Sequence, residues 1–87
     1  MRELPVMART VRTEEDRQLM LQYAILVQET PDGLEHYGVK ITEESATDSA
    51  AVFNLTMSVP RIYGLVELLE NSTVTPIGLM DVVADWL

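Results

Sequence analysis

The sequence predicts an α+β fold in which a three-stranded antiparallel sheet, a meander, is followed by two C-terminal helices packed on one face. Between residues 19 and 57, apolar residues alternate with polar or small ones in three consecutive segments, the pattern of half-buried strands. From residue 59 onward, apolar residues recur every three or four positions, the spacing of one helix face. The linkers between the strand segments are short and polar, which favours antiparallel neighbours.

The first 17 residues differ from the rest of the chain in charge and patterning. They carry four of the six basic residues and four acidic residues, so the net charge of −8 lies entirely in residues 18–87. Their sparse apolar residues fit neither the strand period nor the helix period. We therefore expect a flexible N-terminal tail over residues 1–17, with a strand-like piece near residues 6–11, and a single α+β domain over residues 18–87.

The first two strands are expected to form a hairpin. Alternation runs through residues 19–29 and again through residues 35–43, with Tyr23 and Ile25 on the apolar face of the first segment. Between them lies Thr30-Pro31-Asp32-Gly33, in which proline presets the turn dihedral and glycine accepts a positive φ without steric cost. The chain should reverse direction at this turn.

The third strand, residues 50–57, follows a polar linker, and its alternation predicts which side chains face the helices. We expect Ala51, Phe53, Leu55 and Met57 to point inward. The remaining residues, Val52, Asn54 and Thr56, should then point outward. A glycine in the middle strand, Gly38, marks either a bulge or a close approach that a neighbouring aromatic side chain covers.

Two helix starts follow the third strand. Ser58 is a good N-cap, and Pro60 falls in the first turn, where a missing N–H costs little. The sequence at residues 71–73 breaks this helix, and Thr75 with Pro76 forms a second start signal. The predicted core combines the inward faces of strands and helices: Tyr23, Ile25, Val39, Ile41, Phe53, Leu55, Ile62, Val66, Leu69, Leu79, Val83 and Trp86.

The residues that could carry chemistry are few. The chain has no cysteine and one histidine, His36, so neither thiol chemistry nor a histidine cluster for a metal can form within it. Ser45 or Ser58 could join His36 in a catalytic set, but neither serine lies in a glycine-flanked nucleophile turn. Three carboxylate pairs are expected on solvated surfaces: Glu43 with Glu44, Glu67 with Glu70, and Asp81 with Asp85. We therefore expect no enzyme activity, no cofactor and no metal.

Charge and hydropathy restrict the partners. A net charge of −8 and a pI of about 4.3 argue against nucleic acid and against an anionic membrane surface, since both require clustered cations. No apolar run reaches the roughly 20 residues that a membrane span needs. We expect a cytoplasmic protein without a membrane anchor.

An interaction surface is expected on the sheet itself, because helices on one side leave the other face open. The first strand, residues 19–29, is long and lacks proline and internal charge, so an edge position would make it a template for pairing. The N-terminal segment, a second copy or a partner peptide could occupy it, and we favour a homodimer through this region. The candidate interface residues are Met20, Gln22, Ala24, Leu26, Gly38 and Val52.

The main functional hypothesis is therefore a non-enzymatic protein-interaction or regulatory module that acts as a homodimer. The alternative is a small-molecule-binding domain or minor enzyme that uses the cleft between sheet and helices, with His36 or a carboxylate pair in the site. This alternative predicts a concave pocket that contains at least two of these groups with perturbed pKa values.

Several packing motifs resemble those of a known family. The motifs are Tyr37-Gly38-Val39-Lys40-Ile41, Val59-Pro60, Leu65-Val66-Glu67-Leu68-Leu69, Val74-Thr75-Pro76 and Asp81-Val82-Val83. Over residues 19–87 the chain is similar to a family of short proteins of unknown function from clostridia and related Firmicutes. The resemblance implies a cytoplasmic bacterial protein with this fold, and it brings no catalytic residues.

Overall fold

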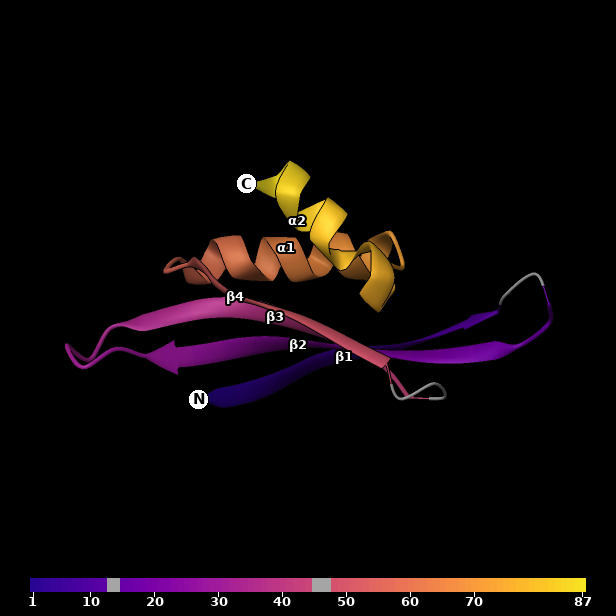
Figure 1. The fold of residues 1–87 in the computed structure, drawn as a ribbon, viewed down its shortest axis with the longest axis horizontal. Coiled ribbons are helices and arrows are strands. Elements are labelled where there is room, and N and C mark those ends of the chain that lie inside the picture. Colours follow the sequence, from indigo (N-terminus) through magenta and orange to yellow (C-terminus); the bar gives the residue numbers. More distant parts are fainter. Residues whose placement is uncertain (13–14, 45–47) are drawn as a thin grey trace.

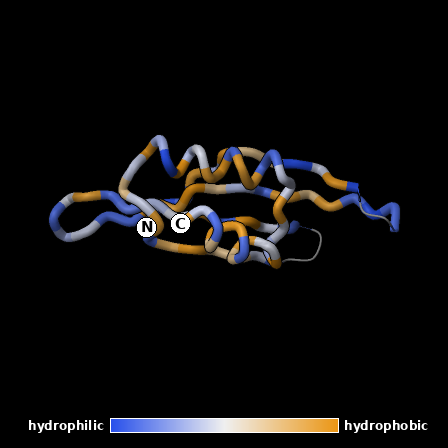
Figure 2. Tube along the Cα trace, turned by 90° about the horizontal axis from the view of Figure 1, so that it is seen from above, coloured by the Kyte–Doolittle hydropathy of each residue, from blue (hydrophilic) through white to orange (hydrophobic). Residues whose placement is uncertain are grey.

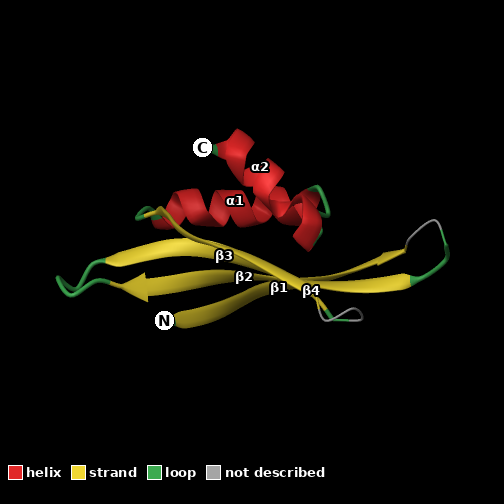
Figure 3. Ribbon diagram, in the orientation of Figure 1, coloured by secondary structure: helices red, strands yellow, loops and turns green. Residues whose placement is uncertain are grey.

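The sheet of the computed structural model, which describes residues 1–12, 15–44 and 48–87, contains four antiparallel strands in the order β1-β2-β3-β4. The strands are β1 (Arg2–Arg12), β2 (Gln18–Glu29), β3 (Glu35–Glu43) and β4 (Asp48–Thr56). They are followed by α1 (Val59–Asn71), the short 3₁₀ helix η1 (Pro76–Gly78) and α2 (Leu79–Trp86). Both α-helices lie on one face of the sheet (Figures 1 and 3), so the predicted α+β fold class is confirmed.

The expectation of three strands is wrong, because Arg2–Arg12 form a fourth strand within the segment that we expected to be a tail. β1 pairs antiparallel with β2 along its whole length, from the Arg2–Val27 pair to the Arg12–Gln18 pair. The register shifts between Pro5 and Met7, where one extra residue enters the strand. This bulge reverses the alternation of faces halfway along β1, which is why its apolar residues fit no single period.

β2 is an interior strand, since β1 and β3 flank it on both sides. The N-terminal segment is therefore the occupant of its free side, and a dimer through the edge of residues 19–29 is excluded by this pairing.

The predicted turn to β3 is confirmed. Gly33 has a φ of 82°, and its N–H donates to the carbonyl oxygen of Thr30 at 2.9 Å.

β4 does not follow the predicted alternation, and it contains a two-residue irregularity opposite β3. Val39 pairs with Val52 but Tyr37 pairs with Thr56, and Asn54 adopts a φ of 55° between them. This irregularity skips two residues and so keeps the alternation of faces; the expected directions of several side chains are wrong because Val52 opposes Val39 and Ala50 opposes Ile41, and both of these β3 residues face the core. Val52 packs against the core instead of facing outward, whereas Phe53 is 44% exposed and is not part of the core. Two further residues expected to point inward are exposed, Ala51 and Met57.

Gly38 explains how β4 can bulge at this point. A Cβ atom on Gly38 would lie 2.2 Å from the carbonyl oxygen of Val52 and 2.9 Å from the Cα of Phe53. Real Cβ atoms do not come this close to backbone, so only glycine allows the bulged backbone of β4 to approach β3. Of the two expectations for Gly38, the bulge is confirmed.

The first helix begins where the sequence predicts, but α2 begins at Leu79 and not at Pro76, because Pro76–Gly78 form the 3₁₀ helix η1 and Thr75 makes no side-chain cap hydrogen bond. The Ser58 hydroxyl accepts a hydrogen bond from the backbone N–H of Arg61, as an N-cap does. α1 ends at Asn71, and Thr73 with a φ of 51° turns the chain toward η1. The guanidinium of Arg61 lies 4.5 Å from the ring centroid of Trp86, which ties α2 to α1.

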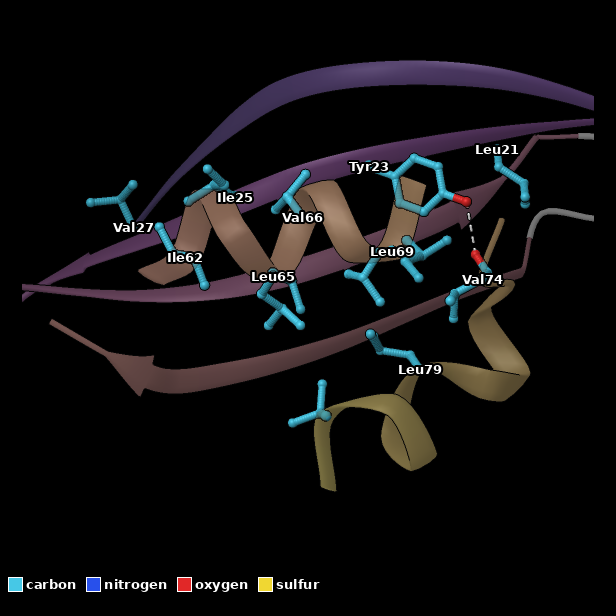
Figure 4. Close-up of a cluster of buried hydrophobic side chains, with 13 residues drawn as sticks. Leu21, Tyr23, Ile25, Val27, Ile62, Leu65, Val66, Leu69, Val74 and Leu79 are labelled. Carbon is cyan, nitrogen blue, oxygen red and sulfur yellow. Dashed lines mark hydrogen bonds between the residues drawn. The ribbon is translucent and has the colours of Figure 1, made fainter. Parts of the chain in front are cut away.

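The core lies between the helices and the three strands β2, β3 and β4 (Figure 4). The phenol of Tyr23, 1% exposed, donates a hydrogen bond of 2.9 Å to the carbonyl oxygen of Val74 in the loop between the helices. Figure 2 shows hydrophilic residues gathered at both ends of the long axis, where strands are connected. β1 forms one side of the sheet and lies next to α1.

Candidate functional site

The most exposed regular element is β1, which forms one edge of the sheet. Every one of its residues except Val11 is exposed, and the apolar side chains of Leu4, Val6 and Met7 are 40%, 36% and 45% exposed. Among the described residues, β1 pairs with β2 alone, so its outer backbone N–H and C=O groups face solvent. The strand contains three arginines and one glutamate and therefore has a local charge of +2 in a strongly acidic chain.

A hollow of about 380 Å³ separates β1 from α1. Its apolar base comes from Val6 and Met7 on the strand and from Val66 on the helix, with the half-exposed ring of Tyr63 beside them. The remaining wall is polar and comes from Glu67, Glu70 and Asn71. We call this feature the β1–α1 hollow.

Glu70 is the charged residue that the fold buries most deeply among the described residues, with 8% of its surface exposed. No hydrogen bond or ion pair to its carboxylate is formed within the described part of the chain. Its charge acts on Tyr23. Burial raises the pKa of the Tyr23 phenol, the positive charge of Arg9 lowers that pKa, and the negative charge of Glu70 raises it. The sequence predicts Glu70 on a solvated surface, and this prediction is wrong.

A smaller cavity of about 130 Å³ lies next to the hollow, on the other side of Tyr63. Arg2 forms an ion pair with Glu35 at its rim, and Tyr37 donates a hydrogen bond of 3.2 Å to the same carboxylate. Burial, followed by this hydrogen bond, raises the pKa of Tyr37. The floor of the cavity is apolar and consists of Leu4, Ile25, Val27, Val59 and Ile62.

The open face of the sheet is less accessible than the sequence predicted. Ala24 and Leu26 are only 7% and 2% exposed, and Gly38 is covered by β4. Lys40 of β3 reaches across β2 to Glu3 of β1 in an ion pair of 3.3 Å, so its stem passes over this region. Of the six candidate interface residues, the structure leaves Met20 and Gln22 exposed on this face, and Gln22 donates a hydrogen bond to Glu44.

The candidate catalytic residues do not come together in the described part of the chain. His36 lies on the open face, where it pairs with Gln28, whereas Ser58 caps α1 on the helix side. Ser45 lies outside the described residues. Asp81 and Asp85 are exposed on α2, and Glu43 and Glu44 lie at the far end of β3. No cluster of three or more potential metal ligands occurs in residues 1–12, 15–44 and 48–87. Likewise, no helix in these residues is long and apolar enough to cross a membrane.

Sequence reasoning missed the β1–α1 hollow because it did not place β1 in the sheet. The signal that was available is the charge distribution, since the N-terminal segment is the least acidic part of the chain. A basic segment is stabilised electrostatically next to an acidic domain, so the charge distribution favours an N-terminal segment that packs on residues 18–87 over one that extends into solvent.

Comparison with known proteins identifies a family. Residues 2–87 match the family described as "Family of unknown function (DUF6514)", so the match includes β1 as well as the rest of the fold. Neither a curated protein nor a solved structure matches the chain.

Proposed function

We propose, for a chain that belongs to the DUF6514 family of unknown function, that it is a non-enzymatic protein-interaction module which assembles as a homodimer through the outer edge of β1. The supporting observation is an 11-residue edge strand whose free backbone groups face solvent and whose side chains are exposed on both faces. Such a strand is a ready template for strand addition, in which backbone hydrogen bonds supply affinity and neighbouring hollows supply specificity.

The distribution of polar residues supports a binding role over a catalytic one. Catalysis requires an acid, a base or a nucleophile within hydrogen-bond reach of one another and of a substrate. In the described chain, His36, Ser58 and the carboxylate pair on α2 occupy three separate surfaces. The polar groups that do converge, Arg2, Glu35 and Tyr37, already bind one another.

Sedimentation velocity over a wide range of protein concentration tests the homodimer. The proposal expects a species of twice the 9.8 kDa chain mass to accumulate as the concentration rises. A matched pair of variants locates the interface, because Ala8 of β1 and Ala51 of β4 are both exposed alanines on edge strands. Ala8→Lys should produce a monomer, whereas Ala51→Lys should leave the dimer intact. A wild-type chain that stays monomeric at hundreds of micromolar would overturn the proposal.

A second candidate function is the binding of a small molecule in the cavity beside Tyr63. Its apolar floor and polar rim suit a ligand with one hydrogen-bonding group, and its 130 Å³ is close to the roughly 150 Å³ of cavities that hold benzene. Ligand-observed NMR with phenol-sized compounds tests this function. Binding that is lost in Ile62→Trp, a substitution that fills the cavity, would support it.

A further inference from the structure

The structure of β1 restricts how two copies can pair, and its charged and apolar side chains favour one register. Residues that oppose each other in a continuous antiparallel sheet point to the same face. In β1 the pairing with β2 places Leu4, Met7, Arg9 and Val11 on the helix face, because their partners Ile25, Tyr23, Leu21 and Leu19 lie on that face. Glu3, Pro5, Ala8, Thr10 and Arg12 lie on the open face.

The bulge between Pro5 and Met7 limits the registers in which faces match along the whole strand. With the twofold axis at a residue, a constant offset mismatches the faces wherever residues from opposite sides of the bulge pair. Two β1 strands can instead pair about Ala8, with Val6 of each strand left without a partner, as it is in the pairing with β2. Opposing side chains then point to the same face of the sheet along the whole strand. A twofold axis at Ala8 then relates the two copies.

We propose that β1 pairs with β1 of a second copy about Ala8, an inference that rests on the proposed homodimer. On the open face, this register sets Arg12 opposite the partner's Glu3, and on the helix face it sets Val11 opposite the partner's Leu4. Opposite charges and apolar pairs across strands are both stabilising. The small Ala8 side chains meet at the axis, where there is no charge to repel. Glu3 keeps its ion pair with Lys40 of the same chain, because one carboxylate can accept hydrogen bonds from two cations.

The β1–α1 hollow supplies independent support for this register. Arg9 of the partner comes to lie opposite Met7, which lines the hollow together with Glu67 and Glu70. Glu70 is nine-tenths buried, and its carboxylate has no hydrogen bond or ion pair within the described chain. No buried side-chain oxygen or nitrogen of the described chain lacks a hydrogen-bond partner, so the Glu70 carboxylate keeps contact with solvent at the hollow, where an incoming guanidinium can form a charge-assisted pair with it. The basic strand of one copy thus complements the acidic wall of the other.

Disulfide trapping tests the register directly, since the chain has no cysteine of its own. In Ala8→Cys the two thiols face each other across the axis, at the Cα separation of about 5 Å that a disulfide requires. In Thr10→Cys, on the same strand and the same face, the two Cα atoms lie more than about 10 Å apart. Mild oxidation should therefore cross-link Ala8→Cys nearly completely and leave Thr10→Cys reduced.

A charge exchange tests the pair between Arg12 and Glu3. Glu3→Arg and Arg12→Glu should each raise the dimer dissociation constant about tenfold, because each creates two like-charged contacts, and the double variant should restore binding. A dimer that cross-links at Thr10→Cys, or that forms without cross-linking at Ala8→Cys, overturns the register but leaves the homodimer standing. A wild-type chain that sediments as a monomer overturns both.

Discussion

The two edges of the sheet are built in opposite ways. β4 is bulged at Asn54, and both η1 and α2 pack beside it, so its outer edge is bent and partly covered. β1 is longer, contains a single extra residue and borders the β1–α1 hollow on its helix side. Bulges and covering helices are the devices by which proteins prevent unwanted strand pairing. The molecule therefore protects one edge and leaves the other available, which supports a role for β1 in assembly.

The largest expected effect comes from breaking the protected edge at Gly38. A Gly38→Ala substitution places a Cβ atom 2.2 Å from the Val52 carbonyl oxygen, so either the bulge or the β3–β4 pairing must shift. Because backbone cannot yield as a flexible side chain does, we expect a loss of about 3 kcal/mol or more in the free energy of unfolding. Urea denaturation followed by circular dichroism measures this loss.

Gly64 provides the matched control for that substitution. It lies in the interior of α1, and a Cβ atom there would meet no heavy atom within 4 Å. Gly64→Ala should therefore stabilise the protein by about 0.5–1 kcal/mol, since alanine restricts the unfolded chain and favours the helix. If both glycine substitutions destabilised the chain equally, the close approach of β4 to Gly38 would not be the cause.

A smaller effect is expected at Tyr23, which holds the inter-helix loop against the sheet and so keeps η1 and α2 beside β4. Tyr23→Phe removes the donor to the Val74 carbonyl oxygen and leaves that acceptor buried, at a cost of about 1–2 kcal/mol. Thermal unfolding of the variant at neutral pH measures this cost. Unchanged stability would show that the loop is held by apolar packing alone.

The same tyrosine should make the stability of the wild-type protein depend on alkaline pH. Burial raises the pKa of Tyr23 above its ordinary value of 10.0, so the folded state favours the neutral phenol. The contribution of this group is fully present below pH 10 and is lost as the pH rises through the higher pKa of the folded state. Tyr23→Phe should lack this part of the alkaline loss, which distinguishes Tyr23 from the other tyrosines.

The contrast between the edges also explains what the sequence could predict. The β2–β3 hairpin and the start of α1 follow from local signals, the Thr30–Gly33 turn and the Ser58 cap, and both are confirmed. The one-residue bulge in β1 reverses its alternation without a strong local signal, so the sequence did not reveal this strand. The core-facing side of β4 is set by its pairing with β3, in which Val52 opposes Val39, and the alternation of β4 alone does not show this register. The position of Phe53 was mispredicted for this reason, and the burial of Glu70 followed from a strand that the periodicity did not reveal.

The smallest expected effect concerns the ties that hold β1 in place. Lys40→Met keeps the apolar stem over β2 and removes the ion pair to Glu3, a pair whose two side chains are 32% and 46% exposed. Exposed ion pairs contribute little, so the free energy of unfolding should change by less than about 0.5 kcal/mol when measured below the concentration of dimer formation. A loss well above 1 kcal/mol would mean that β1 depends on this contact for docking. A negligible loss would instead assign the docking of β1 to its backbone pairing with β2 and to Val11, which packs against the core. These contacts leave the outer side of the strand free for the second copy.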